Sequence, residues 1–216
     1  MKNSSAWFRP SNDNVTQRQK GKPPQFKKIL NFVRHGNYEP GESGGKLTAL
    51  GRKQVVRLAS RLNELRLWPI ERIHTSPWGR AVETAQIIAD QMGGLKVHKR
   101  PFLHEVHPTG SPNIAVPLKI RAIGKENLNI TLKHYFRPPR SMQQEVIVSH
   151  GGLIRALVCR VLDVRLTAHV QMETYEASIT SFLVPSEGKP QLITYNDTGH
   201  LPAQMLTGGV RGTRTQ

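Results

Sequence analysis

The sequence predicts an α/β fold in a single domain, and two observations support this prediction. The chain has 216 residues, which suits one domain of ordinary size and provides enough chain to bury a core. From Lys28 onward, short apolar runs alternate with longer stretches in which apolar residues recur at helical spacing. Such alternation is typical of strand and helix units that stack as an α/β sheet.

The first half of this domain shows clear helix signals between apolar runs. A helix is predicted over 48–65, with Thr48 as its N-cap. A second helix is predicted over 78–92, because the glycine pair that follows it at 93–94 is a typical helix terminator. The apolar runs in this half predict strands at 29–33, 70–75 and 95–98.

The second half begins with an irregular segment. Residues 101–118 contain four prolines together with glycine and serine turn signals, so we expect a long excursion without regular structure. After it, helices are predicted at 120–136 and 152–162, and strands at 145–149, 177–184 and 191–195, the last two pairing around a turn at 185–190.

Composition sets the expected boundaries of the domain. Residues 1–28 hold seven basic residues and one acidic residue, which predicts a flexible basic arm. The arm lacks the apolar core of a secretory signal, whereas its basic, acid-poor character is compatible with mitochondrial targeting. The chain after Leu206 is glycine-rich and basic, so 207–216 are predicted to form a flexible tail and the folded domain is expected over 29–206.

The charge balance indicates which classes of partner to expect. Lysine and arginine number 31 against 15 acidic residues, a net charge of +16, which favours phosphate groups, nucleic acid or acidic membrane surfaces. The sequence lacks the aromatic and zinc-finger patterns of nucleic-acid modules, so no nucleic-acid partner is expected. No apolar run approaches the roughly 20 residues of a transmembrane segment, so none is expected. The single cysteine, Cys159, is expected in the core.

Two histidines directly follow predicted strands and are flanked by glycine. His35 follows the first strand, and His150 follows the strand at 145–149. Ligands bind at the carboxyl ends of strands in open α/β sheets, and glycine lets the backbone approach a ligand closely. Arg80 is expected on the first turn of a helix, where a guanidinium can grip two phosphate oxygens. The sequence therefore predicts a phosphate-binding site at this edge.

Four motifs occur in the order typical of one enzyme family. Together they resemble the histidine phosphatase superfamily, also called phosphoglycerate-mutase-like, in its first branch. The resemblance implies a three-layer sandwich with a mostly parallel central sheet and helices on both faces. It also implies phosphomonoester hydrolysis through a phosphohistidine intermediate, with no metal and no cofactor. The motifs are Arg34-His35-Gly36, Leu47-Thr48-Ala49-Leu50-Gly51, the segment 75–85 around Arg80, and the segment 149–155 that begins Ser149-His150-Gly151-Gly152.

The same resemblance implies roles for individual residues. His35 corresponds to the nucleophile that attacks phosphorus. Arg34, Arg80 and His150 are expected to bind the phosphoryl oxygens and to stabilise the charge that develops in the transition state, so His150 counts as both a catalytic and a phosphate-binding residue.

Two further assignments complete the expected site. Glu105 corresponds to the general acid that protonates the leaving oxygen and then acts as a base toward water. Asn37, directly after the Arg-His-Gly triplet, is expected to donate a further hydrogen bond to phosphate. The histidines at 98, 104 and 107 lie near Glu105, but their spacing matches no standard zinc pattern.

Within the superfamily, the segments 154–160, 177–184 and 196–202 resemble a group of mitochondrial serine/threonine protein phosphatases. The resemblance implies phosphorylated protein substrates and a mitochondrial location, with a cytoplasmic location as the alternative. Activity on phosphorylated metabolites and a basic scaffold without catalysis remain the competing functions. Mutase activity is disfavoured, because the short segment 37–46 contains no tryptophan. A homodimer is compatible with the sequence.

Overall fold

A six-stranded sheet forms the centre of the molecule. The structure, a computed structural model, describes residues 25–109 and 115–209. The strands lie in the order β5-β4-β6-β1-β7-β8. Their bounds are Lys27–Arg34 for β1, Arg72–Thr75 for β4, Lys96–Lys99 for β5, Gln143–Ser149 for β6, Ile179–Pro185 for β7 and Gln191–Asp197 for β8.

The sheet is mostly parallel, as the sequence predicts. Strand β1 pairs in parallel with β6, and β4 pairs in parallel with both β6 and β5. Strand β7 is antiparallel to β1 and to β8, so it is the one strand of this sheet that runs against the others. The carboxyl ends of β1, β4 and β6 therefore meet at one edge, and their amino ends meet at the opposite edge.

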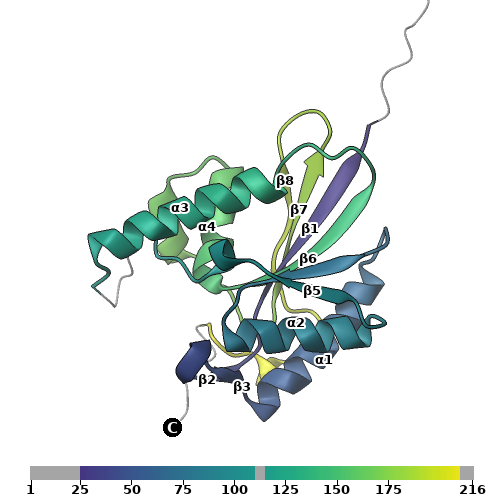
Figure 1. Cartoon of the computed structure of the whole chain (residues 1–216), viewed down its shortest axis with the longest axis vertical. Coiled ribbons are helices and arrows are strands. Elements are labelled where there is room, and N and C mark those ends of the chain that lie inside the picture. Colours follow the sequence, from purple (N-terminus) through teal and green to yellow (C-terminus); the bar gives the residue numbers. More distant parts are fainter. Residues whose placement is uncertain (1–24, 110–114, 210–216) are drawn as a thin grey trace, which may run out of the picture.

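Helices cover both faces of this sheet, which confirms the predicted three-layer sandwich. The helices α1 (Ala49–Glu64) and α2 (Gly79–Gln91) lie on one side, and α3 (Leu118–Tyr135) and α4 (Gly151–Val161) lie on the other (Figure 1). The Thr48 side chain caps α1 by accepting a hydrogen bond of 2.9 Å from the Gly51 amide, as predicted.

The central strand β1 contributes to both hydrophobic cores. Leu30 and Phe32 pack into the cluster beneath α3 and α4, whereas Val33 packs into the cluster beneath α1 and α2. Successive side chains of a strand point to opposite faces. A strand covered on both faces must therefore be apolar on both, which explains why the signal at 29–33 is a continuous apolar run. Cys159 is fully buried in the α4 layer, as expected.

The expected helices and strands are all present, with ends that shift by at most two residues. The sequence analysis missed a two-stranded hairpin formed by β2 (Tyr38–Glu39) and β3 (Lys46–Leu47). These strands are too short to show alternation. It also missed the short 3-10 turns η1 (Glu42–Gly44), η2 (Pro101–Leu103), η3 (Leu166–Gln171) and η4 (Ala203–Met205).

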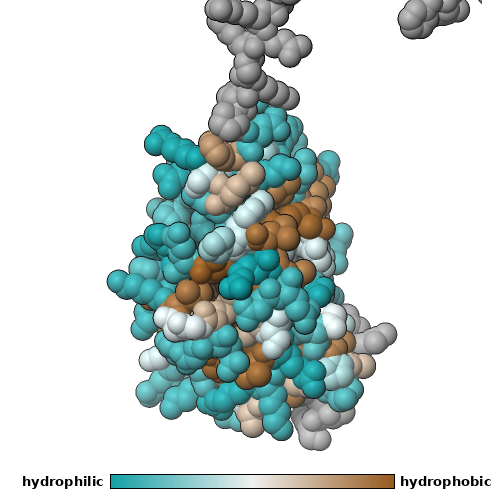
Figure 2. Space-filling model, turned by 90° about the vertical axis from the view of Figure 1, so that its right-hand side faces the viewer, coloured by the Kyte–Doolittle hydropathy of each residue, from teal (hydrophilic) through white to brown (hydrophobic). Residues whose placement is uncertain are grey.

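Both ends of the domain extend slightly beyond the predicted boundaries. Strand β1 starts at Lys27, inside the segment assigned to the basic arm, and residues 207–209 of the predicted tail pack on the domain. Residues 1–24 of the arm and 210–216 of the tail lie outside the described residues. Among the described helices, none has the length and apolar character that a bilayer span needs. On the face in Figure 2, apolar residues form patches separated by hydrophilic ones.

Candidate active site

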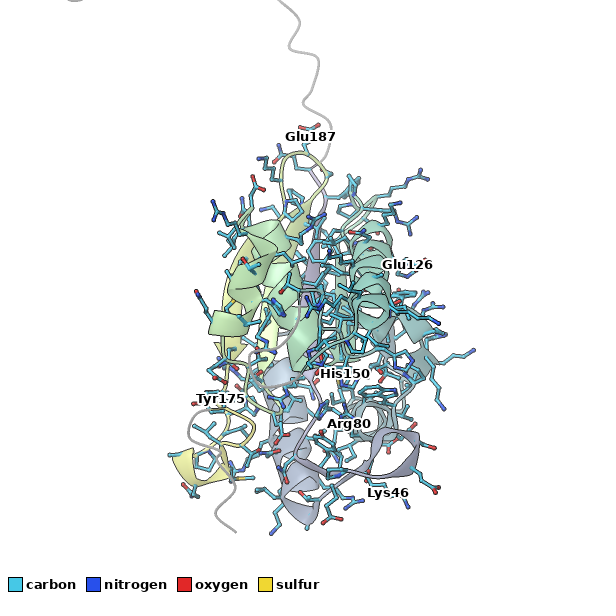
Figure 3. All side chains as sticks on the ribbon, turned by 90° about the vertical axis from the view of Figure 1, so that its left-hand side faces the viewer. Lys46, Arg80, Glu126, His150, Tyr175 and Glu187 are labelled. Atoms are coloured by element: carbon cyan, nitrogen blue, oxygen red, sulfur yellow. The ribbon has the colours of Figure 1, made fainter. Side chains whose placement is uncertain are left out.

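The carboxyl edge of the parallel strands brings the predicted motifs together. The loops leaving β1 and β4 continue the pairing with β6: the His35 amide donates to the Ser149 carbonyl at 3.1 Å, and the Ser76 amide donates to the Val148 carbonyl at 3.0 Å. His150 follows β6 and is the N-cap residue of α4. Arg80, on the first turn of α2, reaches the same place, and Figure 3 shows it beside His150.

Arg80 links the two histidines. Its Nε donates to His35 Nε2 at 2.9 Å, and its Nη2 donates to His150 Nδ1 at 3.2 Å. The guanidinium carbon lies 4.3 Å from the ring centroid of Tyr38 and 4.4 Å from that of Trp78. Two aromatic faces thus hold the cation, an arrangement that is favourable for a desolvated guanidinium. Arg80 also donates to the carbonyl of Gly44.

These contacts determine which nitrogen of each imidazole carries a proton. A guanidinium has no acceptor, so His35 Nε2 and His150 Nδ1 must accept hydrogen bonds from Arg80. The other nitrogen of each ring then carries hydrogen. His35 Nδ1 donates to the Gly36 carbonyl at 2.9 Å, and His150 Nε2 donates to Ser76 Oγ at 2.9 Å. Both rings are therefore neutral, with assigned tautomers.

Electrostatics favour the same neutral state. Burial lowers the pKa of His35 well below 6.5, and the charges of Arg34 and Arg80 lower it further. Burial also lowers the pKa of His150 well below 6.5, with smaller effects from His35 and Arg80. A neutral imidazole is the form that can act as a nucleophile, so the state of the ring agrees with the role expected of His35.

Glu105 lies at the amino end of α4, next to this pair. Its Oε1 accepts hydrogen bonds from the Gly152 amide at 2.8 Å and from the Val106 amide at 3.1 Å. A Cβ at position 152 would collide with the Val106 carbonyl and the Glu105 carboxylate, so this position requires glycine. Glu105 is also close enough to raise the pKa of Arg80 against the larger lowering that burial causes.

Arg34 and Asn37 are engaged by other parts of the chain. Arg34 donates to the carbonyls of Thr174 and of Gly208, the latter at 2.9 Å, and pairs with Glu176 at 3.5 Å. The side-chain amide of Asn37 donates through Nδ2 to Glu176 at 2.9 Å. Its Oδ1 accepts a hydrogen bond from the hydroxyl of Thr48, the cap residue of α1. These contacts tie Asn37 to the site wall, and they favour a positioning role over direct phosphate binding.

Sequence reasoning missed several residues that shape the site. Ser76 and Trp78 lie within the motif around Arg80, so their positions carried a signal that was not used. Tyr38 lies two residues after Gly36, but nothing local marks it as a partner of Arg80. Glu176 has no local signal, because its partners are more than 130 residues away in the chain.

The histidines near Glu105 do not converge. The His98 ring stacks against His74 with centroids 5.7 Å apart, whereas His104 packs edge-on against Trp78 at 5.3 Å. Across residues 25–109 and 115–209, the structure gathers no three metal-binding side chains of the His, Cys, Asp or Glu type.

A buried pair of histidines joined by Arg80 thus lies at the carboxyl edge of the sheet in a three-layer α/β sandwich. The sequence model of the histidine phosphatase superfamily (branch 1) matches residues 30–110 and 138–198. The chain therefore belongs to the histidine phosphatase superfamily, branch 1, as the motifs predict.

Two curated relatives, from a fly and a mouse, carry the same name. The chain is 30% identical over 206 residues to serine/threonine-protein phosphatase Pgam5, mitochondrial, of Drosophila melanogaster, covering 89% of this chain and 70% of the relative. It is 26% identical over 206 residues to the Mus musculus protein of the same name, covering 90% and 71%. The expected resemblance to mitochondrial serine/threonine phosphatases is confirmed at this level of identity.

Solved structures confirm the fold. A phosphoserine phosphatase from Entamoeba histolytica, in complex with 3-phosphoglyceric acid, matches with a TM-score of 0.63 at 24% identity, covering 81% of this chain and all of that one. A phosphoglycerate mutase from Plasmodium falciparum matches with a TM-score of 0.59 at 24% identity, covering 82% and 95%.

The buried neutral histidines predict an acid-sensitive fold. In the unfolded chain His35 and His150 take up protons below their ordinary pKa of about 6.5, whereas the folded protein keeps them neutral. The unfolded state then binds more protons than the folded state. The two histidines together therefore lower the free energy of unfolding by roughly 2 to 3 kcal/mol per pH unit below 6.5. Guanidinium unfolding at pH 7.5 and pH 5.5 measures the loss, and a His35→Asn variant should show a shallower slope. Ring resonances of His35 and His150 that titrate near pH 6.5 in the folded protein would contradict the explanation.

Proposed function

We propose that this protein is a phosphatase that hydrolyses phosphomonoesters through a phosphohistidine formed on His35. The observation that carries this proposal is the state of the His35 ring. The bond from Nδ1 to the Gly36 carbonyl orients the ring, and the lone pair of Nε2 faces the Arg80 guanidinium. A phosphoryl group attracted by that guanidinium would meet Nε2 directly.

In the first step, His35 Nε2 attacks phosphorus, and the bond between phosphorus and the leaving oxygen breaks. Arg80 transfers its hydrogen bonds from the two rings to the phosphoryl oxygens, and Arg34 and His150 stabilise the charge that develops on them. Glu105 donates the proton that the leaving oxygen requires. The products of this step are an alcohol and a phosphohistidine.

In the second step, water attacks the phosphohistidine. Glu105, now a carboxylate, takes a proton from this water as the new phosphorus–oxygen bond forms. The phosphorus–nitrogen bond breaks and returns its electron pair to His35 Nε2, so the neutral ring is restored and phosphate leaves. Asn37 acts as a positioning residue, because it connects the loop after β1 to Glu176.

The proposed nucleophile is testable with one variant. His35→Ala is expected to lower the turnover of p-nitrophenyl phosphate by at least about a thousandfold, since the covalent route is lost. Rapid quenching of the unaltered protein with a 32P-labelled ester should trap an acid-labile phosphoprotein that the variant does not form. His98→Ala is the matched control, because His98 stacks on His74 and makes no contact with His35. Equal turnover by His35→Ala and the unaltered protein would rule out this mechanism, and no turnover by either would favour the basic-scaffold alternative.

The role of Glu105 predicts a dependence on the leaving group. An alkyl oxygen needs a proton to depart, whereas p-nitrophenolate departs readily without one. Glu105→Gln should therefore lower kcat/KM by about a hundredfold for β-glycerophosphate and by much less for p-nitrophenyl phosphate. The variant keeps an oxygen that can accept from the Gly152 amide.

Glu126→Gln, on the exposed surface of α3, is the control for this change in charge (Figure 3). A Glu105→Gln variant that slows both substrates by the same factor would show that Glu105 only positions the site.

We further propose that the substrates are proteins phosphorylated on serine or threonine and that the protein acts in mitochondria. The relatives at 26% and 30% identity are named as mitochondrial serine/threonine-protein phosphatases, which supports both the substrate class and the location. The competing class is small phosphorylated metabolites, since a solved structure with the same fold is named a phosphoserine phosphatase. The net charge of +16 suits either kind of anion.

Substrate preference decides between these classes. We expect higher kcat/KM for phosphoserine and phosphothreonine peptides than for free phosphoserine, 3-phosphoglycerate and sugar phosphates. Phosphate release measured across this panel, at equal substrate concentrations, provides the comparison. A preference for the metabolites would overturn the protein-phosphatase assignment while leaving the phosphohistidine mechanism intact.

A further inference from the structure

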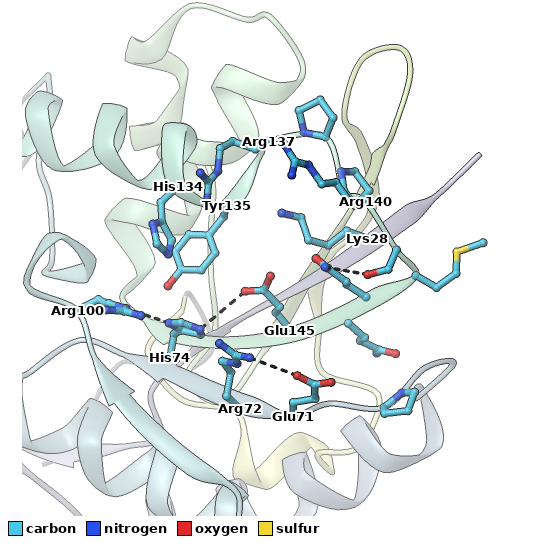
Figure 4. A pocket seen from close by; sticks show the side chains of 17 residues that line it. Lys28, Glu71, Arg72, His74, Arg100, His134, Tyr135, Arg137, Arg140 and Glu145 are labelled. Atoms are coloured by element: carbon cyan, nitrogen blue, oxygen red, sulfur yellow. Dashed lines mark hydrogen bonds and ion pairs between the residues drawn. The ribbon is translucent and has the colours of Figure 1, made fainter. Parts of the chain in front are cut away.

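A second concave site lies at the edge of the sheet opposite the histidines. It is a cavity of about 820 Å³ between the amino ends of β1, β4 and β6 and the carboxyl end of α3 (Figure 4). None of His35, Arg80, Glu105 and His150 lines it. Its volume lies in the range of small-molecule sites. We refer to it below as the basic cavity.

The Lys28 end of the basic cavity is separated from the catalytic edge by the length of the strands. Lys28 lines the cavity and lies near the start of β1, whereas Arg34 ends that strand at the catalytic edge. Six residues of strand span about 20 Å. The other end of the cavity is nearer to the catalytic edge, because Arg100 directly follows β5 and His74 lies two residues before Ser76, the partner of His150. Figure 3 shows the separation at the Lys28 end, because the β7–β8 turn at Glu187, beside the start of β1, lies far from Arg80 and His150. A ligand held between Lys28, Arg137 and Arg140 would therefore not occupy the phosphoryl site.

Positive charge dominates the lining. Five cationic side chains from four segments of the chain face two carboxylates, Glu71 and Glu145. Glu71 pairs with Arg72 at 3.3 Å near the exposed rim. The five cations are Lys28, Arg72, Arg100, Arg137 and Arg140.

The remaining carboxylate, Glu145, forms no ion pair with the other cations of the cavity. It lies 3.9 Å from His74, and burial and the charge of Arg100 lower the pKa of His74 to about 3, so that ring is neutral. Among the described residues, Lys28, Arg137 and Arg140 have no carboxylate within 4.0 Å. The excess of cations over carboxylates is three when the histidines are neutral.

The cavity also contains a buried polar group without a partner. Tyr135 is 1% exposed, and its hydroxyl forms no hydrogen bond of normal geometry with the described residues, although Arg100 lies close enough to influence it. Leaving a buried hydroxyl unpaired costs free energy, so native proteins rarely do so. Figure 4 shows this hydroxyl on the wall that also carries Arg100 and His74.

Lys28 is a cation of the cavity without an ion-pair partner among the described residues. The residue is 5% exposed, and its side chain is directed into the space between Glu145 and Arg137 (Figure 4). Burial lowers the pKa of Lys28, and Arg137 lowers it further, against the opposite effect of Glu145. Cations packed this closely repel one another, and an anion between them would relieve that repulsion.

We propose that the basic cavity binds a small organic anion that carries a diphosphate or two phosphate groups. Each phosphate brings a charge of about −1.5 to −2 near pH 7, so two of them match the excess of cations. The arginines at 137 and 140 supply planar groups that can grip phosphate oxygens in pairs. The Tyr135 hydroxyl and Glu145 are then available to the hydroxyl groups of an attached sugar or polyol.

Calorimetric titration with two probes that resist hydrolysis tests this site. Methylenebisphosphonate provides the bare anion, and adenosine 5′-(α,β-methylene)diphosphate adds a nucleoside. Arg137→Ala/Arg140→Ala removes two exposed cations of the cavity, and Arg57→Ala/Arg160→Ala removes two exposed cations from α1 and α4 as the matched control. Each titration is repeated with orthovanadate present to occupy the catalytic edge.

The proposal predicts that the cavity variant weakens binding by at least about tenfold, whereas the control variant and orthovanadate change it little. Turnover of p-nitrophenyl phosphate should remain unchanged in both variants. Tyr135→Phe should weaken binding a fewfold without lowering Tm, since the hydroxyl has no partner within the described protein. Tighter binding of the nucleoside probe would identify a nucleotide as the source of the diphosphate, and equal binding would identify the diphosphate itself as sufficient.

Three results would overturn the proposal. One is a Kd weaker than about 1 mM for both probes. Another is an equal loss of affinity in the two double variants, which would indicate attraction by net charge alone. The third is loss of binding when orthovanadate is present, which would place the probe at the catalytic edge.

Discussion

The buried Arg80 guanidinium is the interaction on which the site depends. It carries a charge at 6% exposure and binds both histidines, so it determines their tautomers and keeps them neutral. Burying a charge is costly unless it is paired or well solvated by nearby groups. Here the Tyr38 and Trp78 rings and the Gly44 carbonyl supply that environment. The protein itself therefore fixes the position of the guanidinium between the two histidines.

The small hairpin β2–β3 supplies part of the environment that the buried guanidinium needs. It carries Tyr38 and the loop that places the Gly44 carbonyl against the guanidinium. Gly44 has φ of +90°, and a Cβ there would lie 2.6 Å from Trp78 Cβ, so only glycine allows the loop to pack this closely. A two-residue strand pair is weak by itself. Its contacts with Arg80 and Trp78 therefore hold it in place.

Charge is distributed differently at the two edges of the sheet. At the catalytic edge, Glu105 and Glu176 accompany the arginines, so the positive charge is offset and oriented by hydrogen bonds. At the opposite edge, Lys28 and Arg137 have no such partner among the described residues. The lining of the basic cavity thus keeps an excess of three positive charges that can attract an anion.

Local sequence pattern was sufficient to predict the α/β class of the fold, the Thr48 cap and the positions of His35, Arg80 and His150 relative to their strands and helices, and the family resemblance added the three layers. Apolar periodicity and glycine placement act over a few residues, so they can be recognised in the chain alone. The pairing of Glu176 with Arg34 and Asn37, the aromatic walls around Arg80 and the convergence of cations on the basic cavity were decided only by the tertiary structure. Each joins segments far apart in sequence, and the order of strands in the sheet, which no local pattern encodes, determines which of them meet.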